Sequence, residues 1–72
     1  MRNLRWKRTA PYWYEAAAAG VTYIVGPDRP SGYFVECRRA NDLRNSEIIA
    51  RGVPVREAKL IADRHASLVV GR

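Results

Sequence analysis

The sequence predicts a small α+β fold, in which a three- or four-stranded antiparallel sheet packs against one C-terminal amphipathic helix. Two β-branched and aromatic segments flank a loop rich in Gly and Pro, which indicates a hairpin. After Pro54, apolar residues recur at the spacing of a helix. The length of 72 residues suits one small domain, residues 1–72, and no shift in composition marks a linker.

The first expected strand covers residues 4–8, where apolar and basic side chains alternate. This period of two places Leu4 and Trp6 on one face and Arg5 and Lys7 on the other. The segment Thr9-Ala10-Pro11 then favours a turn, because proline lacks an amide donor and restricts the residue before it.

Residues 12–20 admit two interpretations. The aromatic cluster at their start favours a strand. Pro11 before them, the alanine run and the terminal Gly20 favour a helix. We prefer the strand.

The central hairpin joins Val21–Val25 to Tyr33–Arg38 through the loop at residues 26–32. Alternation assigns one set of side chains to the core: Val21, Tyr23, Val25, Tyr33, Val35 and Cys37. Phe34 belongs to the opposite set, and we expect the segment after the hairpin to cover it. Cys37 has no evident base beside it, so it is expected to be a buried small apolar residue.

Residues 39–46 are polar and are expected to form a connection. Residues 47–52 fit either a short strand or the last turn of a helix that Asn41 caps and Gly52 ends. A helix-turn-helix over residues 46–63 is a weaker alternative, because its first helix would be barely two turns long.

The expected helix runs from Pro54 to Val69, and proline suits its first turn. Its apolar stripe contains Val55, Ala58, Ile61, Ala62, His65, Leu68 and Val69. His65 has no second histidine or acid at metal-ligand spacing, so a packed or hydrogen-bonded histidine is expected.

Charge points to the class of partner. The chain has 13 Lys and Arg against 7 Asp and Glu, a net charge of +6, which favours a polyanion. The guanidinium group of arginine binds phosphate or carboxylate, so a nucleic acid and an acidic protein surface are both possible partners. A net charge of this size also serves solubility alone.

Five basic residues are the candidate nucleic-acid contacts, in two groups: Arg5, Lys7 and Arg8, and then Arg38 and Arg39. Phe34 beside them could stack on a base. The alternative for the first group is protection of a sheet edge, since charged side chains suppress edge-to-edge association.

The sequence carries no recognisable catalytic or ligand signature. One histidine, one cysteine and no recognisably spaced pair of acids indicate a non-enzymatic protein without cofactor or metal. No apolar run is long enough to span a membrane, and the basic start lacks the apolar stretch of a secretion signal. We therefore expect a cytoplasmic protein with no membrane partner.

Two motifs carry a resemblance: Trp6-Lys7-Arg8-Thr9 near the start, and the run from Gly52 through Pro54 to Glu57-Ala58-Lys59. With the aromatic strands between them, the chain resembles short orphan proteins of actinobacteria and their phages. The resemblance implies a phage-encoded protein in the host cytoplasm and no shared activity. The layout is also similar to the DNA-binding domains of phage integrases and plant AP2 proteins, which lay a three-stranded sheet on the duplex.

Two functions are therefore open. The first is a small basic protein that contacts nucleic acid through a basic and aromatic sheet surface. The second is a host-directed module that binds an acidic host protein, with Arg and aromatic side chains as anchors. Either would act as a monomer or as a weak homodimer, for which an outer strand edge and the fringe of Leu60, Leu68 and Val70 are the candidate contacts.

Overall fold

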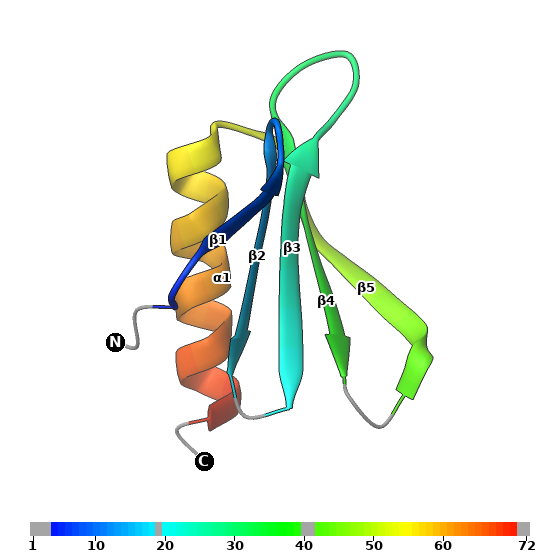
Figure 1. Ribbon diagram of the computed structural model, residues 1–72, viewed down its shortest axis with the longest axis vertical. Coiled ribbons are helices and arrows are strands. Elements are labelled where there is room, and N and C mark those ends of the chain that lie inside the picture. The colour runs from blue at the N-terminus through cyan, green and yellow to red at the C-terminus, as the bar shows by residue number, and fades with distance from the viewer. Residues whose placement is uncertain (1–3, 19, 40–41, 71–72) are drawn as a thin grey trace.

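A computed structural model describes residues 4–18, 20–39 and 42–70 of the chain. Five strands precede one helix (Figure 1): β1 (Lys7–Ala10), β2 (Trp13–Ala18), β3 (Val21–Pro27), β4 (Tyr33–Arg39), β5 (Asp42–Val53) and α1 (Val55–Val70). The α+β class and the closing helix are confirmed.

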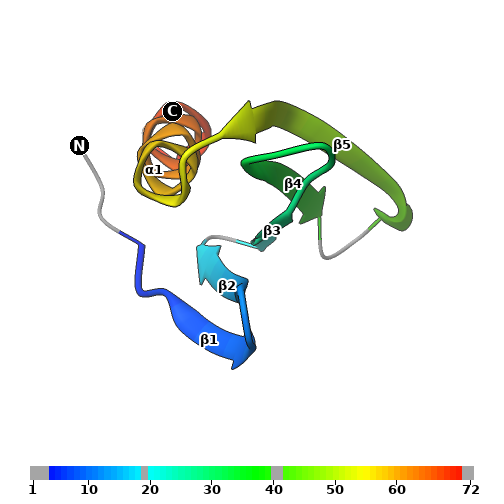
Figure 2. The ribbon, with the colours of Figure 1, turned by 90° about the horizontal axis from the view of Figure 1, so that it is seen from above.

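The sheet is an antiparallel meander in which each strand pairs with the next, in the order β1-β2-β3-β4-β5. Helix α1 lies against one side of the twisted sheet (Figure 2), which we call the helix face. The other side carries no element of the described chain, and we call it the open face. Within the described residues, no helix is long and apolar enough to cross a membrane.

The predicted central hairpin is confirmed, with Tyr23 opposite Cys37 and Val25 opposite Val35. Tyr23, Val25 and Val35 are fully buried on the helix face. The alternation read from the sequence therefore identifies the face that the core occupies. Cys37 is buried as expected, and burial raises the pKa of its thiol.

The helix approaches the sheet through three alanines, Ala58, Ala62 and Ala66, all of which are buried. Their spacing of four residues places them on one stripe of the helix. Because alanine has the smallest side chain that still favours a helix, this stripe lets the helix backbone pack close to the strands. Larger apolar side chains, among them Ile49, Val53 and Val55, close the core at its margin.

A partly buried hydrogen bond joins the helix to the centre of the sheet. The Tyr23 hydroxyl lies 2.8 Å from His65 Nδ1, and the two rings meet edge to face. Burial raises the pKa of Tyr23. The expectation that His65 is a hydrogen-bonded core histidine is confirmed.

The first strand begins later than predicted, at Lys7 instead of residue 4, and it includes Thr9 and Ala10. The turn falls at Pro11 and Tyr12. Residues before the strand are tied to the helix instead, since the Leu4 amide donates to Asp63 Oδ1 at 2.9 Å. Leu4 is buried, as expected for a residue on the apolar face of this segment.

The number of strands is five, not three or four. Segment 12–20 contains strand β2, which confirms the preferred interpretation. The connection expected at residues 39–46 is wrong, because Arg39 ends β4 and β5 begins at Asp42 and continues to Val53. Residues 46–53 are therefore strand, which excludes the helix-turn-helix and the helical alternative for residues 47–52.

The two outer strands are both irregular. Pairing of β1 with β2 shifts between Arg8 and Ala10, and pairing of β5 with β4 shifts at three places. Such bulges hinder the addition of another strand to a sheet edge. The edges are thus poorly suited to pairing with a further strand, and the open face remains as the extended surface of the sheet.

Candidate functional site

Cross-strand pairing orders the open face into rows. The central row runs across all five strands and consists of Lys7, Glu15, Ile24, Glu36 and Ile48. Directly opposed residues share a face, so these side chains lie side by side on the surface. The row begins with the oppositely charged Lys7 and Glu15, and from Glu15 onward acidic and isoleucine side chains alternate.

An aromatic pair adjoins the central row. The six-membered ring of Trp13 lies over Gly26, where a Cβ atom would come within 2.4 Å of Trp13 Cζ3. Phe34, opposite Gly26 on the next strand, meets the Trp13 ring edge to face, with centroids 5.7 Å apart. Glycine at position 26 is therefore what allows the indole to lie on the sheet.

The expectation that the segment after the hairpin covers Phe34 is wrong. That segment becomes β5 and extends the sheet beside β4 instead of folding over it. Phe34 remains half-buried on the open face, while Trp13 is 38% and Ile48 47% exposed. The open face therefore presents aromatic and aliphatic groups to solvent.

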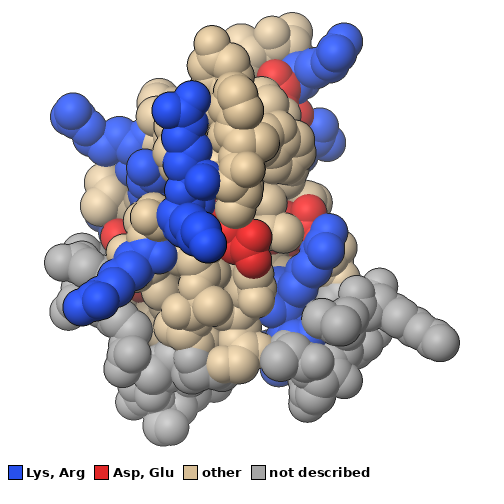
Figure 3. All heavy atoms as spheres, viewed as in Figure 1, with Lys and Arg blue, Asp and Glu red and all other residues tan. Residues whose placement is uncertain are grey.

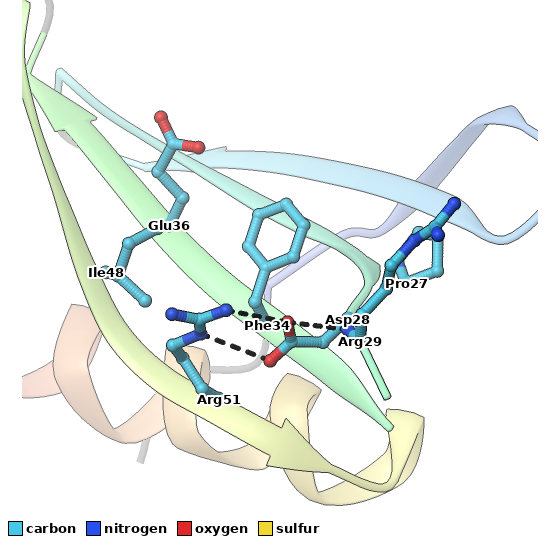
Figure 4. A pocket seen from close by; sticks show the side chains of 7 residues that line it. All are labelled: Pro27, Asp28, Arg29, Phe34, Glu36, Ile48 and Arg51. Carbon is cyan, nitrogen blue, oxygen red and sulfur yellow. Dashed lines mark hydrogen bonds and ion pairs between the residues drawn. The ribbon is translucent and has the colours of Figure 1, made fainter. Parts of the chain in front are cut away.

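Beside Phe34 the open face is hollowed by a depression of about 470 Å³ (Figure 4), lined by Pro27, Asp28, Arg29, Phe34, Glu36, Ile48 and Arg51. Figure 4 shows the Phe34 ring in the middle, with Glu36 and Ile48 on one side and Arg29 extending away on the other. The hollow combines an apolar floor with charged groups at its rim, the usual composition of a small-ligand site.

Asp28 forms the structural anchor of this depression. Its carboxylate accepts hydrogen bonds from the amides of Arg29 at 2.8 Å and Gly52 at 3.0 Å. The Arg51 guanidinium donates to both oxygens, with Nη2 at 3.0 Å from Oδ1 and Nε at 3.3 Å from Oδ2. These bonds fasten the loop after β3 to the end of β5, and the bond from Arg51 contributes most to holding the pKa of Asp28 below its usual range.

Replacing Asp28 by asparagine should remove a pH-dependent part of the stability. A carboxyl whose pKa is lowered by folding stabilises the protein above its unfolded pKa, and this contribution disappears as the pH falls through the folded value. Urea unfolding of both proteins between about pH 7 and pH 2.5 should show a gap that is widest near neutrality and closes in acid. A gap independent of pH would contradict this role of the carboxylate.

The five predicted contact residues do not share one face. Lys7 and Arg38 lie on the open face, because they oppose Glu15 and Thr22. Arg5 precedes β1 and lines a second depression, of about 310 Å³, with Lys7, Thr9, Glu15, Ala16 and Ala17. Arg8 opposes Tyr14 and Arg39 opposes Val21, so both point to the helix side of the sheet.

The cations on this surface are dispersed and partly neutralised. Arg38 Nε lies 2.7 Å from Glu36 Oε1, and Arg51 is paired with Asp28. Among the described residues, Arg5, Lys7 and Arg29 form no ion pair. Figure 3 shows the Lys and Arg side chains projecting at separate places, with acidic groups between some of them. The open face therefore offers spaced single cations instead of a continuous basic patch.

Several residues of this surface were missed by sequence reasoning. Trp13 had a usable signal, because alternation with Tyr14 along a strand places the two on opposite faces. Arg51 and Asp28 had none, since 23 positions separate the two residues that the fold joins. Glu36 shares the face of Phe34 by the alternation of β4, but its place beside Ile48 depends on β5.

No group of three or more His, Cys, Asp or Glu within the described ranges is arranged to hold a metal ion. The described part of the open face thus presents an edge-to-face aromatic pair, single cations and two depressions. In comparisons with protein-family models, with curated proteins and with solved structures, the chain matches none of them.

Proposed function

We propose that the protein is a non-enzymatic nucleic-acid-binding module that holds a single strand on the open face of its sheet. The observation that carries this proposal is the aromatic pair of an exposed Trp13 and a half-buried Phe34, on a sheet surface that no other described element covers. A single strand presents unstacked bases, which stack on such rings, whereas a duplex keeps its bases stacked on one another.

The cations fit a flexible strand better than a duplex. Lys7 and Arg29 belong to β1 and to the loop after β3, on either side of the aromatic pair, and each is free to meet a phosphate. Glu15 and Glu36 interrupt the surface between the basic groups, which disfavours a rigid array of phosphates. A single strand can route its backbone around the two acids.

Salt dependence tests this proposal. Fluorescence anisotropy measures the affinity for a labelled twelve-nucleotide single strand at salt concentrations from about 50 mM upward. A plot of the logarithm of the binding constant against the logarithm of the salt concentration should have a slope near −2, because three cations with no ion pair among the described residues, Arg5, Lys7 and Arg29, would each contribute about −0.7. The double variant Lys7→Gln with Arg29→Gln should flatten the slope by about 1.4.

Arg56→Gln with Arg64→Gln is the matched control for this experiment. It removes the same charge from two exposed positions of helix α1. This control should bind with nearly the original slope. The absence of any binding at about 50 mM salt would refute the proposal, and equal effects of the two double variants would refute the assignment to the open face.

A second function follows from the same surface. The apolar groups Trp13, Ile24 and Ile48, with two acids among them, also suit a protein partner, since aromatic and Arg residues anchor protein interfaces. In that case the module would be phage-encoded and directed at a host protein. Capture from nuclease-treated host lysate separates the two functions, because a protein partner survives the nuclease and a nucleic-acid bridge does not.

The irregular edges bear on self-association. Bulges in β1 and β5 hinder edge pairing. Leu60 and Leu68 of the expected fringe are exposed, and the side chain of Val70 lies outside the described part of the helix. We infer a monomer or at most a weak homodimer in either function.

A further inference from the structure

The depression beside Phe34 has the size and the lining of a site for one nucleobase. Its volume of about 470 Å³ falls within the range of small-ligand pockets, about 300–1,000 Å³. Phe34 supplies a ring in its middle, and Ile48 and Pro27 supply apolar walls (Figure 4). These groups can accept the flat apolar faces of a base but do not distinguish one base from another.

Glu36 supplies the group that can distinguish bases. Its side chain is only 13% exposed, and Oε1 is 2.7 Å from Arg38 Nε. This ion pair fixes the orientation of the carboxylate, and a carboxylate only accepts hydrogen bonds. Oε2 has no hydrogen bond with any described residue. The depression therefore selects a base that presents N–H donors.

Guanine matches this acceptor best. Its Watson–Crick edge carries two adjacent donors, N1–H and the N2 amino group, which fit the two oxygens of one carboxylate. Adenine and cytosine present one amino group beside an acceptor nitrogen, and thymine presents one N–H between two carbonyl oxygens. An acceptor nitrogen or carbonyl oxygen would meet the negative carboxylate unfavourably.

The charges around the depression suit the phosphate of the same nucleotide. Three cations, Arg29, Arg38 and Arg51, stand against two acids, Asp28 and Glu36. Asp28 is saturated by its four donors, so its charge is largely compensated. Arg29 has no ion pair among the described residues and remains available at the rim.

From this geometry we propose that the depression binds one unpaired guanine of the strand, with the base against Phe34, its N1–H and N2 amino group donating to Glu36, and its phosphate near Arg29. The proposal rests on the function proposed above, and it adds base selectivity to it.

The test compares three labelled twelve-nucleotide strands: all thymidine, thymidine with one central guanosine, and thymidine with one central inosine. Inosine lacks only the 2-amino group of guanosine, so it removes one of the two donors. The guanosine strand should bind at least about fivefold more tightly than the thymidine strand, and inosine should lose most of that gain.

Protein variants assign the preference to Glu36. In Glu36→Gln the guanosine preference should disappear, while the thymidine strand binds as well as before or better, because Arg38 is released from its ion pair. Glu15→Gln is the matched control, since it removes the same charge from an exposed position of the central row outside the depression. This control should keep the guanosine preference.

The outcomes separate the two proposals. Equal binding of all three strands to the unmodified protein would overturn the guanine site and leave single-strand binding standing. No binding of any strand would overturn both. A preference that survives Glu36→Gln but not Glu15→Gln would overturn the assignment to this depression.

Discussion

Ala62→Leu is expected to lower the free energy of unfolding by about 3 kcal/mol, the upper end of the usual cost of overpacking. Ala62 is fully buried where the helix lies closest to the sheet, between Ala58 and Ala66 of the same stripe. The larger side chain overfills this buried position and must push the helix away from strands β3 and β4, which it contacts. In a domain of this size that loss corresponds to a fall in melting temperature of about 12–24 °C.

Thermal and urea unfolding measure this effect directly. Arg64→Leu is the control, because it places leucine at an exposed position of the same helix and should change the stability by less than about 0.5 kcal/mol. If the two variants unfolded at the same midpoint, the close packing of helix and sheet would be incorrect.

Trp13→Ala is expected to weaken binding of a single strand by about fivefold or more, since one base stacked on an aromatic ring contributes about 1–3 kcal/mol. Trp13→Phe should recover much of the affinity, because it restores a ring over Gly26. Anisotropy titrations at fixed salt measure both.

Stability is the necessary control for Trp13→Ala, because the indole also contacts Phe34. Urea unfolding shows whether each variant is folded under the conditions of the binding titration. A folded Trp13→Ala protein that binds with the original affinity would exclude stacking on this ring.

The predictable part of the fold rests on strong local patterns. Residues 21–25 and 33–38 are rich in β-branched and aromatic side chains and have turn residues between them. Their period of two identifies the buried side chains without any tertiary information. The helix after Pro54 is equally periodic. In both cases the local preference agrees with the final packing.

Strand β5 could not be predicted in the same way. Its first half is polar and lacks alternation, and its pairing with β4 is irregular, so its period is disturbed. What holds it is backbone hydrogen bonding to a strand already fixed by the core, which is a tertiary effect. Of the difference between the three or four strands expected and the five observed, this segment accounts for one strand.

The candidate site depends on that same strand. The basic residues were evident from composition, but their distribution over two faces follows from the register of β1 with β2 and of β3 with β4. The depression requires Ile48 and Arg51 from β5 next to Phe34. A surface assembled from three strands and a loop has no local signature in the sequence.

The two tryptophans provide the most direct test of binding on the open face. Trp13 is exposed on that face, whereas Trp6 has its indole Nε1 buried and packs against the core. In a ¹⁵N-resolved NMR titration with a guanosine-containing single strand, the Trp13 indole signal should shift progressively and saturably while the Trp6 signal stays in place. Shifts confined to helix α1, or a Trp13 signal unmoved when the strand is bound, would contradict binding on the open face of the sheet.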